Sequence, residues 1–451
     1  MRQFLGKIIV LMMISGCSGG DSGIQKATCV EQHATFLQLK EVSNLPQSAR
    51  ALISVFSLKK GGPALGDYGS LAHEWRGAWR TKALSMDRKK LKEWVDSLPI
   101  EKWYSENLHL AQKERLHRIK GNTNIGAINS IAQPGIMVEH ANLRLLPTDY
   151  PLYKPVSEAF FGAPFDRLQN SYLHAGTAVY ISHWTKDRAW ALIEDGSSHA
   201  SGFVKSNQVA LMDDAALRRV NPLPIAVCLK DNHPLYDEQG LFLAHTRLGS
   251  VLFVEKQDDK NMHVLWPQRN DKGMACWKKV RIAQNVASTT PLVWNHQNLV
   301  SVLEQLLGKP YGWGGLFGNR DCSAMVQDYF RVFGINLPRN SKGQIEKKKG
   351  VFIDLSSLSN EEKEQKVIRE GVPYRTILYR PGHIGIYVGC LKGRAIMIHA
   401  VWEVNLHSTE GKFRRNVIGK AIASHLDYGK ELPGVLMDKL FLTRLSGMRT
   451  F

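Results

Sequence analysis

Acidic residues and cysteines are both few in this chain of 451 residues, which has 41 Asp and Glu against 59 Lys and Arg and only six cysteines. The formal charge is therefore +18 at pH 7. No nucleic-acid recognition motif accompanies this charge, which argues against a nucleic-acid partner. An anionic membrane surface or an anionic cell wall remains as a partner, and a merely solvated basic surface is the alternative. The ordinary globular composition excludes disordered and fibrous classes, and the length allows about three or four domains.

A long apolar run is missing at the N-terminus. The apolar residues 8–14 follow the basic Arg2 and Lys7 and are far too few to span a bilayer. They lead into the sequence ISGC, which ends at Cys17 and resembles the lipobox of bacterial lipoproteins. In such proteins the cysteine is lipidated and becomes the mature N-terminus. A plain signal peptide that is cut elsewhere is the alternative.

The residues after the lipobox point to a tethered protein. Residues 18–27 are rich in Ser and Gly and predict a flexible tether. Ser18, rather than Asp, follows the cysteine, and by the same resemblance this indicates the outer membrane of a Gram-negative cell. Diacyl and N-acyl chains together would anchor the protein stably. We therefore expect a signal peptide at 1–17 and an outer-membrane lipoprotein that faces the periplasm.

Five cysteines remain once Cys17 is set aside, and five is an odd number: Cys29, Cys228, Cys276, Cys322 and Cys390. In an oxidising periplasm a leftover cysteine suggests a working thiol. Cys228 and Cys276 lie in one predicted module and could pair, although sequence does not establish connectivity. Cys322 has the setting that best fits chemistry.

Residues 28–127 predict an α-rich N-terminal segment, which we interpret as a stabilising domain. Helices are expected at residues 88–98 and 102–118, and no constellation of catalytic type appears among them. Trp75 and Trp79 are four residues apart. This helical spacing favours packing residues over a ligand site.

Two series of short apolar strands, separated by turn signals, follow at residues 128–215 and 222–285. Each series predicts a small β-barrel. The order of strands in the first series resembles a bacterial SH3 domain. A long loop in that series carries Asp166 and Tyr172. The alternative for Asp166 is a turn or cap residue.

The last part of the chain, residues 290–451, has the pattern of an α+β domain. A glycine-rich, aromatic loop runs into Asp321-Cys322-Ser323, and an apolar segment of helical period follows. Cys322 is therefore expected at a helix N-terminus, where unpaired N–H groups and the helix dipole lower a thiol pKa. A buried, inert cysteine is the alternative. The polar neighbours of Cys322 argue against it.

Two histidines complete a catalytic set. His383 begins one alternating strand and His399 lies near the end of the next, so antiparallel pairing places both at one end of a sheet. A cysteine hydrolase needs a thiolate, a base and a polar group that orients the base. Cys322, His383 and His399 supply these types in that order. The backbone N–H of Cys322 would help to hold the oxyanion.

With these residues in place, the C-terminal domain resembles the NlpC/P60 cysteine peptidases, a compact papain-like fold that cuts peptidoglycan stem peptides. The whole order is similar to the subgroup with an N-terminal stabilising domain and two SH3-like domains. The motifs that carry the resemblance lie at residues 310–315 (PYGWGG), 321–323 (DCS), 337–344 (LPRNSKGQ), 381–389 (PGHIGIYVG) and 398–400 (IHA).

The resemblance implies a role for each matching residue. Cys322 would be the nucleophile, His383 the general base and acid, and His399 the orienting residue. Asp321 and Ser323 would help to bind the free amine and the γ-D-glutamyl portion of the substrate. The loop at Tyr311 and Trp313 would form a wall of the cleft.

The resemblance also implies that the first barrel closes the groove, which favours peptides with a free L-Ala amine. Asp166 and Tyr172 are the candidates for this contact. The basic residues 347–349 and the tail after Pro433 depart from the family pattern and leave substrate length open.

We therefore expect a monomeric peptidoglycan hydrolase that cleaves the D-γ-glutamyl–meso-diaminopimelate amide of muropeptides and uses no metal or other cofactor. Its partners would be stem peptides and, through the lipid anchor, the membrane. The alternatives are an amidase or an endopeptidase of another bond, an acyltransferase with the same thiol chemistry, and a non-catalytic lipoprotein that binds the cell wall.

Overall fold

A computed structural model describes residues 34–56, 62–98, 102–107, 109–154, 162–198, 200–407 and 413–451. The lipobox with Cys17, the tether at 18–27 and Cys29 lie outside these ranges, so their assignments stay predictions. Within the described ranges, every helix is too short or too polar to cross a bilayer.

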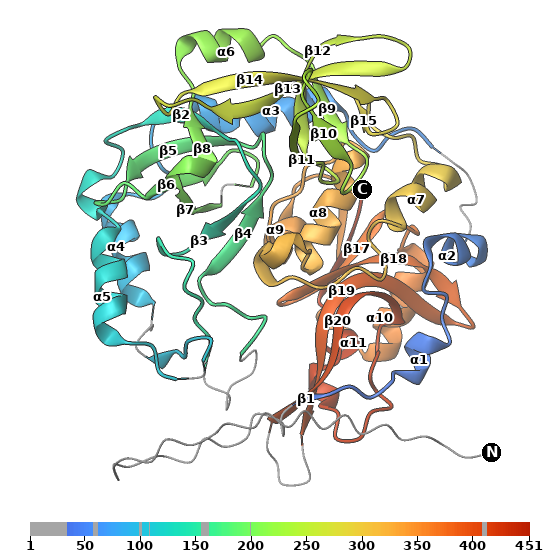
Figure 1. The fold of residues 1–451 in the computed structure, drawn as a ribbon. Helices are drawn as coiled ribbons and strands as arrows, with labels where there is room; N and C mark the ends of the chain where they lie inside the picture. The colour runs from blue at the N-terminus through green and yellow to red at the C-terminus, as the bar shows by residue number, and fades with distance from the viewer. Residues whose placement is uncertain are drawn as a thin grey trace, which may run out of the picture.

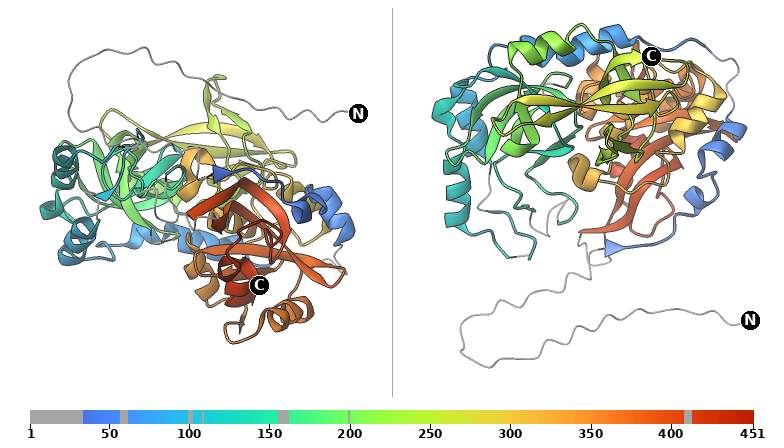
Figure 2. Two further views of the ribbon diagram at one scale, coloured as in Figure 1. Left: turned by 90° about the horizontal axis from the view of Figure 1, so that it is seen from below. Right: turned by 45° about the horizontal axis from the view of Figure 1, so that its top comes forward.

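The N-terminal segment extends over the surface of the later domains (Figures 1 and 2). Its helices are α1 (Lys40–Ser43), α2 (Ala49–Val55), α3 (Tyr68–Trp75), α4 (Arg88–Ser97) and α5 (Lys113–Asn122), and η2 (Arg76–Arg80) and η4 (Ile125–Ala127) are 3-10 turns. The side chains of Ser48, Asp67 and Asp87 cap α2, α3 and α4. The helix expected at 88–98 is confirmed as α4. The one expected at 102–118 is wrong in its first half, because α5 begins only at Lys113.

The segment contacts more than one domain. Helix α2 packs on α7, and strand β1 (Ala34–Thr35) joins the C-terminal sheet. The rings of Trp75 and Trp79 lie 5.6 Å apart, and both contact the ring of Phe253 in a later domain. Their prediction as packing residues is confirmed. The name "stabilising domain" stays a prediction.

The first β module, residues 133–211, is a seven-stranded antiparallel sheet with the order β4-β3-β7-β6-β5-β2-β8. Alternate apolar residues of its strands, such as Leu143, Val179 and Ile193, are fully buried in a common core. Its strands are β2 (Gln133–Met137), β3 (Ala141–Arg144), β4 (Gln169–Leu173), β5 (Ala178–Trp184), β6 (Trp190–Asp195), β7 (Ser201–Lys205) and β8 (Val209–Leu211).

The second β module, residues 225–288, follows helix α6 (Asp214–Val220) and has a five-stranded sheet of order β14-β13-β12-β9-β15 beside the hairpin β10-β11. Cys228 and Cys276 are both free thiols, so the disulfide that the sequence allowed is not formed. The strands are β9 (Ile225–Cys228), β10 (Pro234–Tyr236), β11 (Phe242–His245), β12 (Val251–Gln257), β13 (Asn261–Arg269), β14 (Ala275–Ala283) and β15 (Ala287–Ser288).

The C-terminal domain is built on a seven-stranded sheet of order β1-β20-β19-β18-β17-β21-β16. The chain's last strand, β21, lies inside this sheet between β17 and β16, so the tail after Pro433 is part of the fold. The strands are β16 (Val351–Asp354), β17 (Thr376–Arg380), β18 (His383–Leu391), β19 (Arg394–His407), β20 (Phe413–His425) and β21 (Gly447–Thr450). The helices are α7 (His296–Leu303), α8 (Cys322–Val332), α9 (Ser341–Glu346), α10 (Asn360–Glu370) and α11 (Phe441–Arg444), with the 3-10 segments η6 (Trp313–Gly318) and η7 (Met437–Lys439).

Helix α8 lies at the centre of the molecule, where the C-terminal domain meets both β modules (Figure 1). It packs against β18 and β19, and its side chains Val326, Tyr329 and Phe330 are fully buried. Burial of a side chain of this size stabilises the fold by roughly 1.5–3 kcal/mol. The residue that begins α8 is therefore held on a rigid element.

Candidate active site

Cys322 is the first residue of α8, as the sequence predicts. The preceding residue, Asp321, has extended backbone geometry and caps the helix, because its carboxylate accepts a hydrogen bond of 2.8 Å from the N–H of Ala324. The glycine-rich loop η6 lies directly before this cap. Gly314 and Gly315 in that loop have positive φ angles, at 57° and 88°. Added Cβ atoms there would come within 2.7 Å of Gln169 and 2.3 Å of Tyr172. Glycine thus lets the loop approach the first β module closely.

His383 and His399 meet across neighbouring strands. The Nε2 of His383 lies 2.7 Å from the Nδ1 of His399, and the two rings are in an edge-to-face arrangement. Gly385 on β18 is the neighbour of His399 on β19, because a Cβ added to Gly385 would lie 3.1 Å from the Cβ of His399. His383 is two residues before Gly385 and hence on the same face of the strand. The strand register thus brings the two imidazoles together, and it leaves the Nδ1 of His383 for the thiol.

The thiol of Cys322 lies close to the backbone N–H of Ile384, the residue after His383, and this N–H favours the thiolate. The start of β18 thus lies beside the start of α8, and the two elements pack together. Between the thiol and the His383 imidazole themselves, no hydrogen bond is found among the described residues. Catalytic hydrogen bonds are often long in free enzymes and tighten when substrate binds.

The sequence predicts a lowered thiol pKa for Cys322, and this prediction is wrong for this structure. Burial of the thiol, together with the neighbouring Asp321 carboxylate, raises the pKa of Cys322 to about 12, whereas a helix N-terminus alone would lower it. Burial also holds the pKa of His383 well below its usual value, with the nearby His399 and Arg380 acting in the same direction. At neutral pH the resting pair is therefore a neutral thiol beside a neutral imidazole, and the proton must move when substrate binds.

Asp321 and Ser323 form one cluster with Arg339. Arg339 donates to both carboxylate oxygens of Asp321, at 3.0 and 2.7 Å, and to the Ser323 hydroxyl at 2.8 Å. Asp321 also accepts from the Ser323 hydroxyl and from the N–H of Gly314. The structure brings both predicted residues to the thiol, and it gives Asp321 a direct role in holding the helix start, the loop and Arg339. Their contact with substrate stays a prediction.

A groove of about 590 Å³ opens over Cys322. The C-terminal domain contributes Tyr311, Trp313, Asp321, Cys322, Ser323 and Arg339 to its lining. The rest of the lining includes Leu145, Gln169, Asn170, Ser198, Ala200 and Ser201 of the first β module, and Ser85, Met86 and Trp94 of the N-terminal segment. Tyr311 and Trp313 therefore lie on the cleft wall, as expected. Burial and the nearby Cys322 hold the pKa of Tyr311 well above its usual value, so its hydroxyl stays protonated.

Asp166 does not face this groove, and its assignment to substrate binding is corrected. Its side chain is only 2% exposed and pairs with Arg144, whose Nη1 lies 2.5 Å from the carboxylate. The other carboxylate oxygen accepts from the N–H groups of Leu152 and Leu168. Asp166 thus organises the loop from within the first β module. Its carbonyl oxygen accepts from the Nε1 of Trp313 at 3.1 Å, which supports the cleft wall indirectly.

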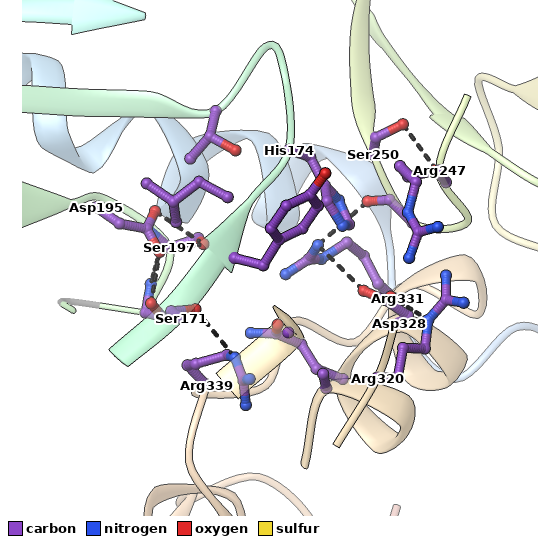
Figure 3. A pocket seen from close by; sticks show the side chains of 18 of the residues that line it. Ser171, His174, Asp195, Ser197, Arg247, Ser250, Arg320, Asp328, Arg331 and Arg339 are labelled. Carbon is purple, nitrogen blue, oxygen red and sulfur yellow. Dashed lines mark hydrogen bonds and ion pairs between the residues drawn. The ribbon is translucent and has the colours of Figure 1, made fainter. Parts of the chain in front are cut away.

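Tyr172 also lies outside the groove. It belongs to strand β4 rather than to the long loop, and it lines a second, smaller cavity where both β modules meet α8. Figure 3 shows this cavity, with Arg320 and Arg331 beside Asp328 and with Arg339 hydrogen-bonded to Ser171. The assignment of Tyr172 to substrate binding is therefore corrected to a contact between modules.

Sequence reasoning missed several residues of the groove. Arg339 was inside a recognised motif, LPRNSKGQ, but nothing in the spacing says that it pairs with Asp321. Met86 and Trp94 lie on a segment whose only sequence signal is amphipathic helix, so their place on the groove wall depends on the tertiary fold. The hydrogen bond from the Gln169 amide to the Gly314 carbonyl, at 3.0 Å, likewise had no sequence signal.

Comparison with known proteins agrees with this architecture. Residues 308–421 match the model of the NlpC/P60 family, whose members are in general cell-wall peptidases, and residues 151–205 match an SH3 domain of the SH3b1 type. No curated protein sequence matches the chain. The fold is similar to that of an NlpC/P60 endopeptidase from Photobacterium damselae subsp. piscicida, at 23% identity and a TM-score of 0.70 over 80% of this chain and 84% of that one.

An NlpC/P60 family protein from Bacillus cereus ATCC 10987 is also similar, at 16% identity and a TM-score of 0.43 over 70% of this chain and 99% of that one. The matches at residues 151–205 and 308–421 confirm the predicted multidomain arrangement of an SH3-like domain and an NlpC/P60 domain. The SH3-like nature of the second β module and the domain boundaries stay predictions.

Proposed function

We propose that this chain, which carries an NlpC/P60 domain at residues 308–421, is a cysteine peptidase of the cell wall that hydrolyses the D-γ-glutamyl–meso-diaminopimelate amide of peptidoglycan stem peptides. The observation that carries the proposal is the arrangement at the groove floor. A thiol at a helix start lies beside Ile384, the residue after His383, and His383 is hydrogen-bonded to His399. These are the nucleophile, base and orienting group that thiol hydrolysis needs.

The first half of the reaction forms a thioester. The sulfur of Cys322 attacks the γ-glutamyl carbonyl carbon while its proton passes to the Nδ1 of His383. The carbonyl oxygen becomes an oxyanion that can be held by the backbone N–H of Cys322 and by the protonated Tyr311 hydroxyl in the same groove. The intermediate then collapses: the C–N bond breaks, and the proton on His383 goes to the diaminopimelate amine, which leaves.

The second half consumes water. His383 takes a proton from the water, whose oxygen attacks the thioester carbon. The C–S bond breaks and the proton returns to the sulfur, which restores the neutral pair. No electrons are exchanged with any other group, so the cycle needs only substrate and water.

The lining of the groove supports a trimmed substrate with a free N-terminal L-Ala. Residues of the first β module and Trp94 line the same groove as the thiol, so they limit the room for a glycan attached to the L-Ala amine. A groove of about 590 Å³ is of the size that encloses a small ligand, for which roughly 300–1,000 Å³ is typical.

We also propose that the protein works as an outer-membrane lipoprotein facing the periplasm, on the evidence of the lipobox sequence that ends at Cys17. Metabolic labelling with a tritiated fatty acid tests this. Label should enter the full chain and be absent from Cys17→Ala, which would then appear in the soluble periplasmic fraction. Equal labelling of the two would reject Cys17 as the lipidation site.

The reaction is tested with the chain lacking residues 1–17. It is incubated with L-Ala-γ-D-Glu-meso-diaminopimelate and with the N-acetylated analogue, and products are identified by mass. Release of L-Ala-D-Glu from the free-amine peptide alone is expected. Cys322→Ala and His383→Ala should each lose turnover while keeping the fold, and Cys390→Ala, which removes an exposed thiol, should be fully active.

Each alternative has its own outcome. Equal cleavage of both peptides rejects selection for the free amine. Products of another bond indicate an amidase or a different endopeptidase, and peptide transfer to an added amine in preference to water indicates an acyltransferase. No cleavage, with Cys322→Ala still sedimenting with purified sacculi, indicates a wall-binding protein.

A further inference from the structure

A third polar side chain continues the row formed by His383 and His399. Ser424 lies on β20, and its Oγ is 3.0 Å from the Nε2 of His399. Both residues are completely buried. The contact follows from the register, because His399 pairs with Ile422 and Ser424 is two residues further along β20. Residues two apart share a face, so Ser424 is the diagonal cross-strand neighbour of His399.

The hydrogen bonds of Ser424 determine where its proton is. Its Oγ is also 2.9 Å from the carbonyl oxygen of His425, which can only accept. A hydroxyl has one proton, and that proton goes to the carbonyl. The bond to His399 must therefore be donated by the imidazole, so His399 carries its proton on Nε2.

The proton on Nε2 then sets the direction of every bond toward the thiol. Burial lowers the pKa of His399 to about 3, so its ring is neutral and its Nδ1 is bare. The 2.7 Å contact between the imidazoles is then a bond from the Nε2–H of His383 to the Nδ1 of His399. A neutral His383 that is protonated on Nε2 has a bare Nδ1, which is the form that can accept the proton of Cys322.

Without the Ser424 hydroxyl this order would be lost. The Nε2–H of His399 would be buried without an acceptor, which favours the tautomer protonated on Nδ1. In that tautomer the Nδ1–H of His399 points at the Nε2–H of His383, so two donors face each other. The repulsion is relieved when the proton of His383 moves from Nε2 to Nδ1. His383 could then no longer take a proton from the thiol.

The strand end that carries Ser424 is itself held from outside the sheet. The side-chain amide of Gln47, from the N-terminal segment, donates to the carbonyl of Ala423 at 2.9 Å and accepts from its N–H at 3.0 Å. These two bonds fix the backbone immediately before Ser424. A serine that merely fills the core would not require its neighbour to be fixed in this way.

We propose that Ser424 is a positioning residue, which fixes the tautomers of His399 and His383 so that His383 presents a bare Nδ1 to Cys322. The proposal rests on the function proposed above, since it concerns the same thiol. It can nevertheless be tested without any peptide substrate, because alkylation of Cys322 by iodoacetamide also requires removal of the thiol proton.

The test measures the alkylation rate of Cys322 from pH 5 to 9 by mass spectrometry of its peptide, with the exposed Cys390 in the same molecule as internal reference. Ser424→Ala should slow Cys322 about tenfold or more, as loss of an orienting partner does elsewhere, and should shift its pH profile. Ser424→Thr, which keeps the hydroxyl, should restore most of the rate. Ser446→Ala removes a hydroxyl that bonds to Tyr379 in the same domain, and it should change nothing.

A second measurement covers the case in which Ser424→Thr does not fold. Nitrogen NMR of the imidazoles reports which ring nitrogen carries the proton. In the wild type His399 and His383 should both be protonated on Nε2, and in Ser424→Ala the proton of His399 should move to Nδ1. An unchanged alkylation rate and unchanged tautomers in Ser424→Ala would overturn the proposal. An inactive wild type on muropeptides, with the alkylation difference intact, would reject the peptidase function and leave Ser424 in its role.

Discussion

The two β modules both contact the part of the C-terminal domain that surrounds α8, but through different elements and with different chemistry. The first module supplies six residues to the groove wall and contacts the glycine-rich loop η6 through Gln169 and the Asp166 carbonyl. Among the described residues, none of the second module lines that groove. It instead contacts α8 and the residue before its cap through arginine side chains. The Asp231 carboxylate accepts two hydrogen bonds from Arg320, at 2.6 and 2.9 Å, and the Gly249 carbonyl accepts one from Arg331.

The difference suggests a division of labour between two modules of similar size. Contacts of the first module determine what can approach the thiol, whereas those of the second keep the helix that carries the thiol in place. Substitutions in the two modules should therefore separate: the first should affect substrate binding, and the second should affect stability.

The largest effect is expected at Arg320, where the second module and α8 share a buried ion network. Its guanidinium, which is nearly inaccessible, also donates to Asp328 at 2.7 Å. Arg320→Met would remove the cation that is hydrogen-bonded to both Asp231 and Asp328 and leave them only the longer contacts to Arg247 and Arg331, so it should lower the free energy of unfolding by about 3–5 kcal/mol. Urea unfolding followed by tryptophan fluorescence measures this.

The matched control for Arg320 is an exposed pair. Lys342 and Glu346 are 3.8 Å apart on α9 with most of their side-chain surface in water. Lys342→Met should therefore change the unfolding free energy by less than about 0.5 kcal/mol. A loss below about 1 kcal/mol for Arg320→Met would mean that the second module does not brace α8.

A similar ion pair lies wholly inside the first module. Asp166→Asn leaves the buried Arg144 guanidinium without its carboxylate and should cost about 3 kcal/mol of stability. Because Asp166 does not line the groove, KM measured on the folded protein should change less than about threefold, well under the 1.4 kcal/mol that a tenfold change represents. A large rise in KM with unchanged stability would restore Asp166 as a substrate residue.

Acidification should loosen the region where the two modules meet. His140 and His174 lie there, close to Arg247, Arg320, Arg331 and the carboxylate of Asp231, and Asp195 and Asp328 line the same cavity as His174. Burial lowers the pKa of His140 to about 4. A hydrogen bond to the His245 carbonyl and the nearby Asp231 carboxylate both raise this pKa, but burial outweighs them. Burial also holds the pKa of His174 well below its usual value, with His140 and the arginines adding to the effect.

The sign of the pH effect follows from these shifts. Below about pH 6.5 the unfolded chain binds protons at both histidines while the folded chain does not, so stability falls as pH drops from 6.5 toward 4. The loss that is due to His140 alone should be on the order of 2 kcal/mol by pH 4.5, and His174 adds to it. Thermal melts across this range measure it, and His140→Gln should flatten the slope. If melting temperature depended on pH equally in the wild type and in His140→Gln, His140 would not contribute to the pH dependence of stability.

Much of the catalytic domain follows from local sequence pattern. The helical period after Cys322 and the alternation after His383 predict α8 and β18, and both are confirmed. Chain order then places His383 and His399 on neighbouring strands, since short connections join antiparallel strands. The two histidines therefore meet as expected.

The remaining features depend on long-range contacts that leave no local signal. Ser424 reaches His399 only through the register of a third strand, and the pairing of Arg144 with Asp166 joins residues 22 apart across a loop. The thiol pKa was misjudged for the same reason. The helix N-terminus is visible in the sequence, but the burial and the Asp321 carboxylate that outweigh it depend on how the domains close over the thiol.

The smallest predicted effect separates the two modules most cleanly, because it compares two half-buried leucines. Leu145 belongs to the first module and lines the groove, whereas Leu243 of the second module does not line it and packs against the core cluster of that module. Each Leu→Ala removes a similar amount of buried apolar surface and should cost about 1–2 kcal/mol of stability. Only Leu145→Ala removes a surface that substrate can contact, so KM for the free-amine peptide should rise about threefold to tenfold there, with kcat nearly unchanged, as expected for a loss of uniform binding. Leu243→Ala should leave KM unchanged. Steady-state kinetics on both variants measures this, and equal KM values would mean that the first module does not form part of the substrate site.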